Sequence, residues 1–167
     1  VVCKPNDAVR QAARAIATDE LSESKKTQYE FWTKFRDKLA TTRAIPSLQT
    51  PRPQYWFDVT LGKSYIHLSN TCNTDQNTVG VRVYIGSRIA ETMLPYLESR
   101  KTEIETELGE TLTWNPNPDN RDKVITITKQ TDFRNERQVE EALDWLVQKT
   151  INFRNVFSKI IRQQRTE

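Results

Sequence analysis

The stretch TVGVRVYI, residues 78–85, decides the fold that the sequence predicts. Valine or isoleucine recurs at every second position, which is the period of a β-strand with one buried face. The four residues of odd number are expected to point toward a core, and Gly80, Arg82 and Tyr84 to point away from it.

Two further strands are predicted directly upstream, at residues 55–60 and 65–72. Gly62-Lys63 is expected to turn the chain between them, and the Asn- and Asp-rich residues 73–77 to turn it into residues 78–85. Strands joined by short turns pair side by side, so the sequence predicts a three-stranded antiparallel meander.

Helical periods surround this meander. Upstream, a helix is predicted from about Asp19 or Ser22 to Thr41, after a shorter helix that ends near Ala17. Its core stripe is expected to comprise Tyr29, Trp32, Phe35 and Leu39, with Phe31 just beside it. The intervening residues 43–54 contain three prolines and are expected to form a linker.

Downstream, a helix is predicted over residues 87–108, with Ser87 as its N-cap and Gly109 as its C-terminal stop. Pro95 predicts a kink or break in its first third. Two short strands are expected to follow, at residues 110–114 and 123–129.

A last helix is predicted from about Asn135 to Gln163, with apolar residues at heptad spacing and Thr150 in one heptad position. This stripe is expected to pack on the sheet, although the seam of a coiled-coil dimer has the same spacing. The sequence leaves both interpretations open.

The predicted order is α-α-βββ-α-ββ-α, which indicates an α+β fold: an antiparallel sheet, consisting of a three-stranded meander plus two further strands, packed by long helices. Residues 1–18 are interpreted as an N-terminal arm and short helix, and residues 19–167 as a single domain. Because the chain begins Val1-Val2-Cys3 without an initiator methionine, we expect it to be the C-terminal part of a larger protein.

Rare residues exclude several functional classes. The single histidine, His67, and the two cysteines, Cys3 and Cys72, disfavour a zinc site or a Cys-His catalyst. Four scattered glycines give no phosphate-binding loop. We therefore expect no cofactor, no metal and no catalytic residue in this chain. No apolar run approaches the roughly 20 residues that span a bilayer, so no membrane partner is expected.

The outward face of the meander is the first candidate site. Its predicted members are aromatic or cationic: Trp56, Tyr65, His67, Arg82 and Tyr84. Aromatic rings stack on unpaired bases and arginine attracts phosphate, so this composition is typical of a nucleic-acid platform. A face covered by another domain or a second copy would have the same composition.

The basic end of the last helix is the second candidate, with Lys159, Arg162 and Arg165 as phosphate contacts. A solvated helix face explains these cations equally well. Glu103 and Glu107 lie one helical turn apart in an acidic stretch, where a solvated helix face is expected and a magnesium-binding pair is the alternative. The net charge is +3, from 25 Lys and Arg against 22 Asp and Glu, and this small value hides one basic and one acidic stretch.

Several blocks resemble a family of uncharacterised bacterial and archaeal domains. They are Lys4-Pro5-Asn6, Phe31-Trp32 with Phe35, Pro51-Arg52-Pro53 with Trp56, Gly62-Lys63-Ser64, Ile66-His67-Leu68, Tyr84-Ile85-Gly86, Ile104-Glu105, Glu107-Leu108-Gly109, Leu112-Thr113-Trp114, Asp132 and Trp145. Ala8 departs from the pattern, where a bulky aromatic residue is expected.

The resemblance implies a place C-terminal to a PD-(D/E)XK nuclease-like domain of the same polypeptide. It also implies a bacterial, cytoplasmic setting and a role connected with defence against foreign DNA. We therefore expect a non-catalytic accessory domain that contacts nucleic acid or positions the nuclease-like half. The alternatives are a protein-interaction or dimerisation module, which would use the last helix or the sheet face, and a ligand-sensing pocket between the sheet and the last helix.

Overall fold

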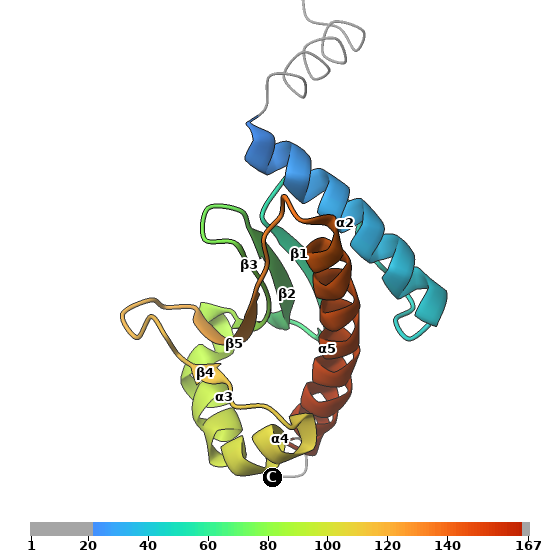
Figure 1. Ribbon diagram of the computed structural model, residues 1–167. Helices are drawn as coiled ribbons and strands as arrows, with labels where there is room; N and C mark the ends of the chain where they lie inside the picture. Colours follow the sequence, from blue (N-terminus) through green and yellow to red (C-terminus); the bar gives the residue numbers. More distant parts are fainter. Residues whose placement is uncertain (1–21, 165–167) are drawn as a thin grey trace, which may run out of the picture.

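The computed structural model describes residues 22–164, which form four helices and one five-stranded sheet (Figure 1). In chain order the elements are α2 (Glu23–Thr42), β1 (Trp56–Lys63), β2 (Ile66–Asn73), β3 (Thr78–Ile85), α3 (Ser87–Ser99), α4 (Lys101–Leu108), β4 (Thr113–Trp114), β5 (Lys123–Gln130) and α5 (Glu136–Gln163). The α+β class and the order of these elements confirm the prediction from the sequence. The short helix predicted before residue 18 lies outside the described residues.

The sheet is antiparallel throughout, in the order β1-β2-β3-β5-β4. The predicted meander forms its first half, and β5 returns to pair with β3. In this register Val83 lies opposite Leu68 on one side and Ile125 on the other, and all three are fully buried. The alternation that begins in β3 therefore continues across its neighbours and gives the sheet one apolar face.

Helices α2 and α5 lie along one side of the sheet (Figure 1). The heptad stripe of α5 is completely buried there at Leu143, Leu146, Thr150, Phe153, Phe157 and Ile160. The stripe therefore packs into the core of its own chain. The 28 residues of α5 are too polar to cross a membrane, and no other helix within residues 22–164 is long and apolar enough to do so.

Helix α2 buries a stripe different from the one predicted. Tyr29 is 48% exposed, whereas Phe31 is 2% exposed. The buried residues Gln28, Phe31, Trp32, Phe35 and Leu39 share one side of the helix, and Tyr29 stands about 100° around the axis from Gln28. The prediction for Tyr29 is therefore wrong. Its aromatic character suggested core packing, but the helical period places it in solvent.

The turn between β1 and β2 lies later than predicted. Gly62 is part of β1, where the pairing register shifts between Thr60 and Lys63, and its φ of 83° suits a bulge. The chain reverses at Ser64 and Tyr65, and Tyr65 adopts a φ of 70°. This shift matters for the candidate site because it places Tyr65 at the turn instead of inside the strand.

Two predictions for the helix after β3 are also corrected. Ser87 is the first residue of α3 and makes no N-cap hydrogen bond with its side chain; its N–H donates to Asp122 Oδ1 at 2.8 Å. Pro95 remains inside α3, and the break falls at Arg100, where φ is −106° and ψ is 12°. Proline removes one helical hydrogen bond, but its fixed φ still fits a helix.

A carboxylate joins α4 to β4. Glu105 Oε2 accepts hydrogen bonds from the Leu112 N–H at 2.8 Å and from Trp114 Nε1–H at 3.0 Å. Gly109 lies between them with a φ of 68° and ends α4 in the left-handed conformation that glycine favours. Three neighbouring blocks of the family resemblance therefore have a structural role here, because their residues close this connection: Ile104-Glu105, Glu107-Leu108-Gly109 and Leu112-Thr113-Trp114.

Candidate nucleic-acid interface

The predicted sheet residues lie together on the face opposite the helical core. In β1, Phe57 and Val59 are buried, so Trp56 and Asp58 point outward, which resolves the ambiguity of this strand. His67 lies directly opposite Tyr84 across β2 and β3. The fold thus gathers onto one surface the side chains that the strand period predicted to face outward.

His67 and Tyr84 form a stacked pair. Their ring centroids are 5.3 Å apart and their planes differ by 26°. The Tyr84 hydroxyl donates a hydrogen bond to Asp122 Oδ2, while the other carboxylate oxygen of Asp122 accepts the Ser87 N–H. The hydrogen bond to Asp122, and to a smaller extent burial, raise the pKa of Tyr84 above its ordinary value. The hydrogen bond to Asp122 therefore holds the polar end of the Tyr84 ring in place.

Arg82 occupies the middle of the face and lies between two tyrosine rings. Its guanidinium carbon is 5.5 Å from the centroid of Tyr55 and 5.9 Å from that of Tyr84. Nη2 donates to Ser69 Oγ at 2.8 Å and Nε to the Ser69 carbonyl at 3.4 Å. These contacts orient the guanidinium plane, and within residues 22–164 they leave Nη1 without a hydrogen-bond acceptor.

Tyr55 was not recognised as a site residue from the sequence. It lies one residue before β1, and its backbone carbonyl accepts a hydrogen bond from the Cys72 N–H at 2.7 Å. Its ring meets Trp56 edge to face at 5.3 Å, and the two residues are 45% and 38% exposed. The strand predicted over residues 55–60 would give Tyr55 the inward direction of Phe57 and Val59, but β1 begins at Trp56 and Tyr55 lies outside its alternation.

Tyr65 extends the aromatic surface at the turn before β2. It is 51% exposed, and the guanidinium of Arg88, from the first turn of α3, lies 5.2 Å from its ring centroid. Tyr65, His67 and Asp58 line the same shallow hollow beside β1. We refer to Tyr55, Trp56, Tyr65, His67, Arg82 and Tyr84 together as the aromatic platform.

Asp58 is the acidic neighbour of the platform. Its Oδ1 lies 3.6 Å from His67 Nε2, and this oxygen is buried and accepts no hydrogen bond within the described residues. A protonated His67 would therefore find a carboxylate partner here. The remaining acid beside the platform, Asp122, is already engaged by Tyr84 and Ser87.

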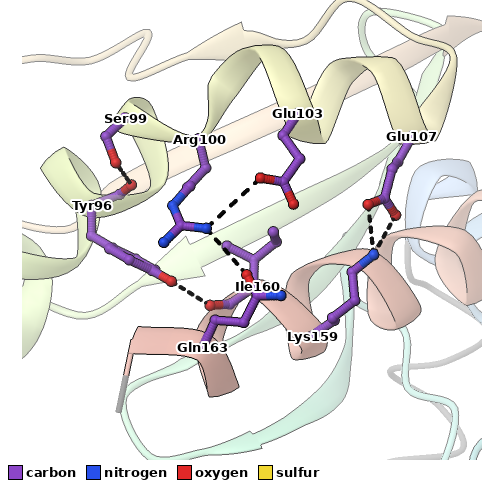
Figure 2. A network of polar contacts seen from close by, with 8 residues as sticks. All are labelled: Tyr96, Ser99, Arg100, Glu103, Glu107, Lys159, Ile160 and Gln163. Carbon is purple, nitrogen blue, oxygen red and sulfur yellow. Dashed lines mark hydrogen bonds and ion pairs between the residues drawn. The ribbon is translucent and has the colours of Figure 1, made fainter. Parts of the chain in front are cut away.

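The basic end of α5 has a different environment from the platform. Lys159 Nζ contacts both carboxylate oxygens of Glu107, at 2.6 and 2.7 Å (Figure 2). Lys149 pairs with Glu110 at 3.1 Å. The acidic and basic stretches that were separate in the sequence therefore meet and neutralise each other. Arg162 is exposed, and Arg165 lies outside the described residues.

A polar network secures the end of α5 to the junction of α3 and α4 (Figure 2). Tyr96 donates its hydroxyl hydrogen to the Ile160 carbonyl at 2.6 Å. Arg100 Nη1 reaches Gln163 Oε1 at 3.2 Å and Glu103 Oε1 at 3.7 Å. Glu103 and Glu107, the two carboxylates of the alternative magnesium site, are thus each in contact with a cation. Among the described residues no group of three His, Cys, Asp or Glu side chains is arranged to hold a metal ion.

Cys72 provides no reactive site on this surface. Its side chain is fully buried on the inner face of β2, and burial raises the pKa of its thiol. A thiol that stays protonated is a poor nucleophile and a poor metal ligand. The position is therefore that of a small apolar core residue.

The fold and this surface define an α+β domain with one face of its sheet packed by helices and the other face open and aromatic. The chain belongs to the family described as "Domain of unknown function (DUF4268)", which matches residues 27–161. No curated protein and no solved structure matches the chain. The matched range includes the whole sheet and the full aromatic platform.

Proposed function

We propose that this domain is a non-catalytic accessory module that binds nucleic acid on its aromatic platform. It would serve a nuclease-like domain of the same polypeptide, in a bacterial and cytoplasmic setting connected with defence, as the family resemblance implies. The module contributes affinity and position, and the chemistry belongs to its partner domain.

The single observation that carries the proposal is the environment of Arg82. This guanidinium is flanked by the rings of Tyr55 and Tyr84 and is oriented by Ser69, yet no carboxylate within residues 22–164 lies at ion-pair distance. A cation held between aromatic planes can contact a phosphate while the neighbouring rings stack on bases.

The surroundings of the other candidates favour this location. Lys159 of the second candidate already has Glu107 as its partner, so a phosphate would have to displace a close ion pair. The apolar stripe of α5 is buried within the chain, which removes the seam required for a coiled-coil dimer. The sheet face thus remains the more accessible surface for a partner.

The ligand-sensing alternative is weakened by the packing between the sheet and α5. The apolar residues that line both sides belong to one continuous buried cluster. A cluster of this kind leaves side chains in contact with one another and gives a ligand little room.

Fluorescence anisotropy with labelled single-stranded and duplex oligonucleotides at low salt tests the proposal. We expect binding by the wild-type domain, and a loss of about tenfold or more in the double variant Arg82→Ala with Tyr84→Ala, because one ion contact and one stacking surface are removed. Arg137→Ala with Tyr29→Ala is the matched control, since both of its side chains are exposed away from the platform.

Two results would contradict the proposal. One is the absence of measurable binding at low salt. The other is equal binding by the wild type, the platform variant and the control, with thermal melting showing that all three are folded. Magnesium-dependent cleavage of DNA by this chain alone would overturn the non-catalytic part of the proposal.

A further inference from the structure

The aromatic platform is arranged in rows across the sheet. His67 and Tyr84 are directly opposite each other, and the next row along contains Ser69 and Arg82. Beyond it, Thr71 lies opposite both Trp56 and Gly80. At the other end the Gly86 N–H donates to the Tyr65 carbonyl at 2.7 Å and forms a fourth row. Successive rows are two residues apart, which corresponds to about 7 Å along an antiparallel strand.

Each row presents a planar group that can contact a base. Tyr65 stands at one end, followed by the stacked pair of His67 and Tyr84, then by the Arg82 guanidinium, and the edge-to-face pair of Tyr55 and Trp56 stands at the other end. The four rows together span about 20 Å. The planes therefore follow one another along β2 and β3 as a track.

Two arginines along the track can contact a phosphate backbone. Arg82 and Arg88 each lie over a tyrosine ring, and neither has a carboxylate partner among residues 22–164. Lys38, Lys149 and Lys159, which lie elsewhere in the fold, are all paired with acids. The two arginines of the track thus have no acidic partner within the described residues, whereas these three lysines are already neutralised.

We infer that the platform is a track for single-stranded nucleic acid, with about four nucleotides bound, one base to each row. This inference rests on the proposed function and specifies its ligand. A duplex is a poor ligand because its base faces are already stacked on one another, whereas an unpaired strand can offer each base to a ring. Four nucleotides is at the lower end of the site size of single-strand-binding domains, which is about 4–16 nucleotides.

A length series tests the track directly. Unlabelled thymidine and uridine oligonucleotides of two, three, four, six and eight residues compete with a labelled single strand, alongside a duplex of equal mass. We expect affinity to rise up to four residues and to change little beyond that. The thymidine and uridine arms distinguish DNA from RNA as the source of the strand.

Variants at one end of the track add a second readout. Tyr65→Ala should weaken a four-residue strand by about tenfold, the loss of one stacked base, and should bring the plateau to three residues. Tyr65→Phe should retain both the affinity for a four-residue strand and the plateau at four residues. Tyr29→Ala removes a tyrosine of nearly the same exposure from α2 and should have no effect.

The outcomes separate this inference from the proposed function. Duplex binding as tight as single-strand binding, or affinity that still rises between four and eight residues, would overturn the track. An affinity for single strands that does not change in Tyr65→Ala would also overturn the track. If the same binding still depended on Arg82 and Tyr84, the proposed function would stand without the track. Failure of every oligonucleotide to bind would overturn both.

Discussion

Removal of the Arg82 guanidinium should weaken single-strand binding and reduce its dependence on salt. Arg82→Ala removes the guanidinium plane that lies beside Tyr55 and Tyr84, together with Nη1, which has no acceptor within residues 22–164. Two separate effects on binding are expected: the loss of the contact between the guanidinium plane and a base, which is nearly independent of salt, and the loss of a phosphate contact, which depends on salt.

The size of both effects can be worked out. One phosphate contact on a single strand contributes about 0.7 to the slope of log affinity against log salt, so it accounts for a factor of about 2.6 over a fourfold rise in salt. The contact of the guanidinium with the face of a base contributes about 0.5–1 kcal/mol to binding, a factor of roughly two to five. We therefore expect Arg82→Ala to bind about tenfold more weakly at low salt, and the difference from wild type to narrow as salt is added.

The assay is an anisotropy titration at several salt concentrations. Arg82→Lys should restore the slope without the full affinity, because an ammonium keeps the charge but lacks the planar group that stacks on a base. Arg137→Ala makes the same change in net charge at a guanidinium whose side chain is 90% exposed on α5. If Arg137→Ala reduced the slope as much as Arg82→Ala, diffuse charge would explain the binding and the reasoning would be refuted.

Three further predictions concern stability. Glu105 accepts two hydrogen bonds, the stronger effect coming from the Leu112 N–H and the next from Trp114, and these lower its pKa. The stabilisation is therefore complete above the pKa of an unfolded glutamate and is lost as pH falls through the lower folded value. In urea unfolding, Glu105→Gln should lower the free energy of unfolding by about 1 kcal/mol at pH 7. The variant should also lose less stability than the wild type as the pH falls. An unchanged dependence of stability on pH would contradict this role of Glu105. Gly109→Ala should lower the free energy of unfolding, measured by thermal unfolding, by about 1 kcal/mol. The cause is the φ of 68° alone, because nothing lies within 4 Å of the new Cβ. An unchanged free energy of unfolding would show that the turn can relax. Phe153→Ala should cost about 3–5 kcal/mol at every protein concentration, because the ring is fully buried within one chain; a concentration-dependent midpoint would indicate a dimer seam.

The sheet was the most predictable part of the fold. The strand over residues 78–85 begins and ends where the period of two predicts, because a buried face forces strict alternation on its side chains. The last helix was predicted almost as well, since Asn135 accepts a hydrogen bond from the Gln138 N–H and marks its start. Both signals are local and strong.

The errors arose where distant residues decide the structure. The N-terminus of α3 is satisfied by Asp122, which is 35 residues away, so the local Ser87 was a misleading signal. The helix breaks at Arg100 instead of Pro95, and there the Arg100 side chain contacts Gln163 of α5 at 3.2 Å as well as Glu103 of the adjoining helix α4 at 3.7 Å. Such long-range partners leave no periodic trace in the sequence.

The candidate site shows the same division. The strand period placed His67, Arg82 and Tyr84 on one face, but no pattern indicated that Tyr55 would cover Arg82. Conversely, Lys159 looked available in the sequence because its partner Glu107 lies 52 residues earlier. The two candidate sites therefore differ in ion pairing: Lys159 of the basic helix is paired with a distant acid, whereas Arg82 of the platform has no carboxylate partner within residues 22–164.

The indole N–H signals of the tryptophans give the most direct test of the platform as the binding surface. Trp32 donates to the Gln54 carbonyl and Trp114 to Glu105, whereas Trp56 is 38% exposed beside Tyr55. In a nitrogen-15 NMR titration with a short single strand, we predict shifts at the Trp56 indole and along the backbone of β2 and β3, with Trp32 and Trp114 unmoved. Shifts confined to the end of α5, with the Trp56 signal unchanged, would contradict the account.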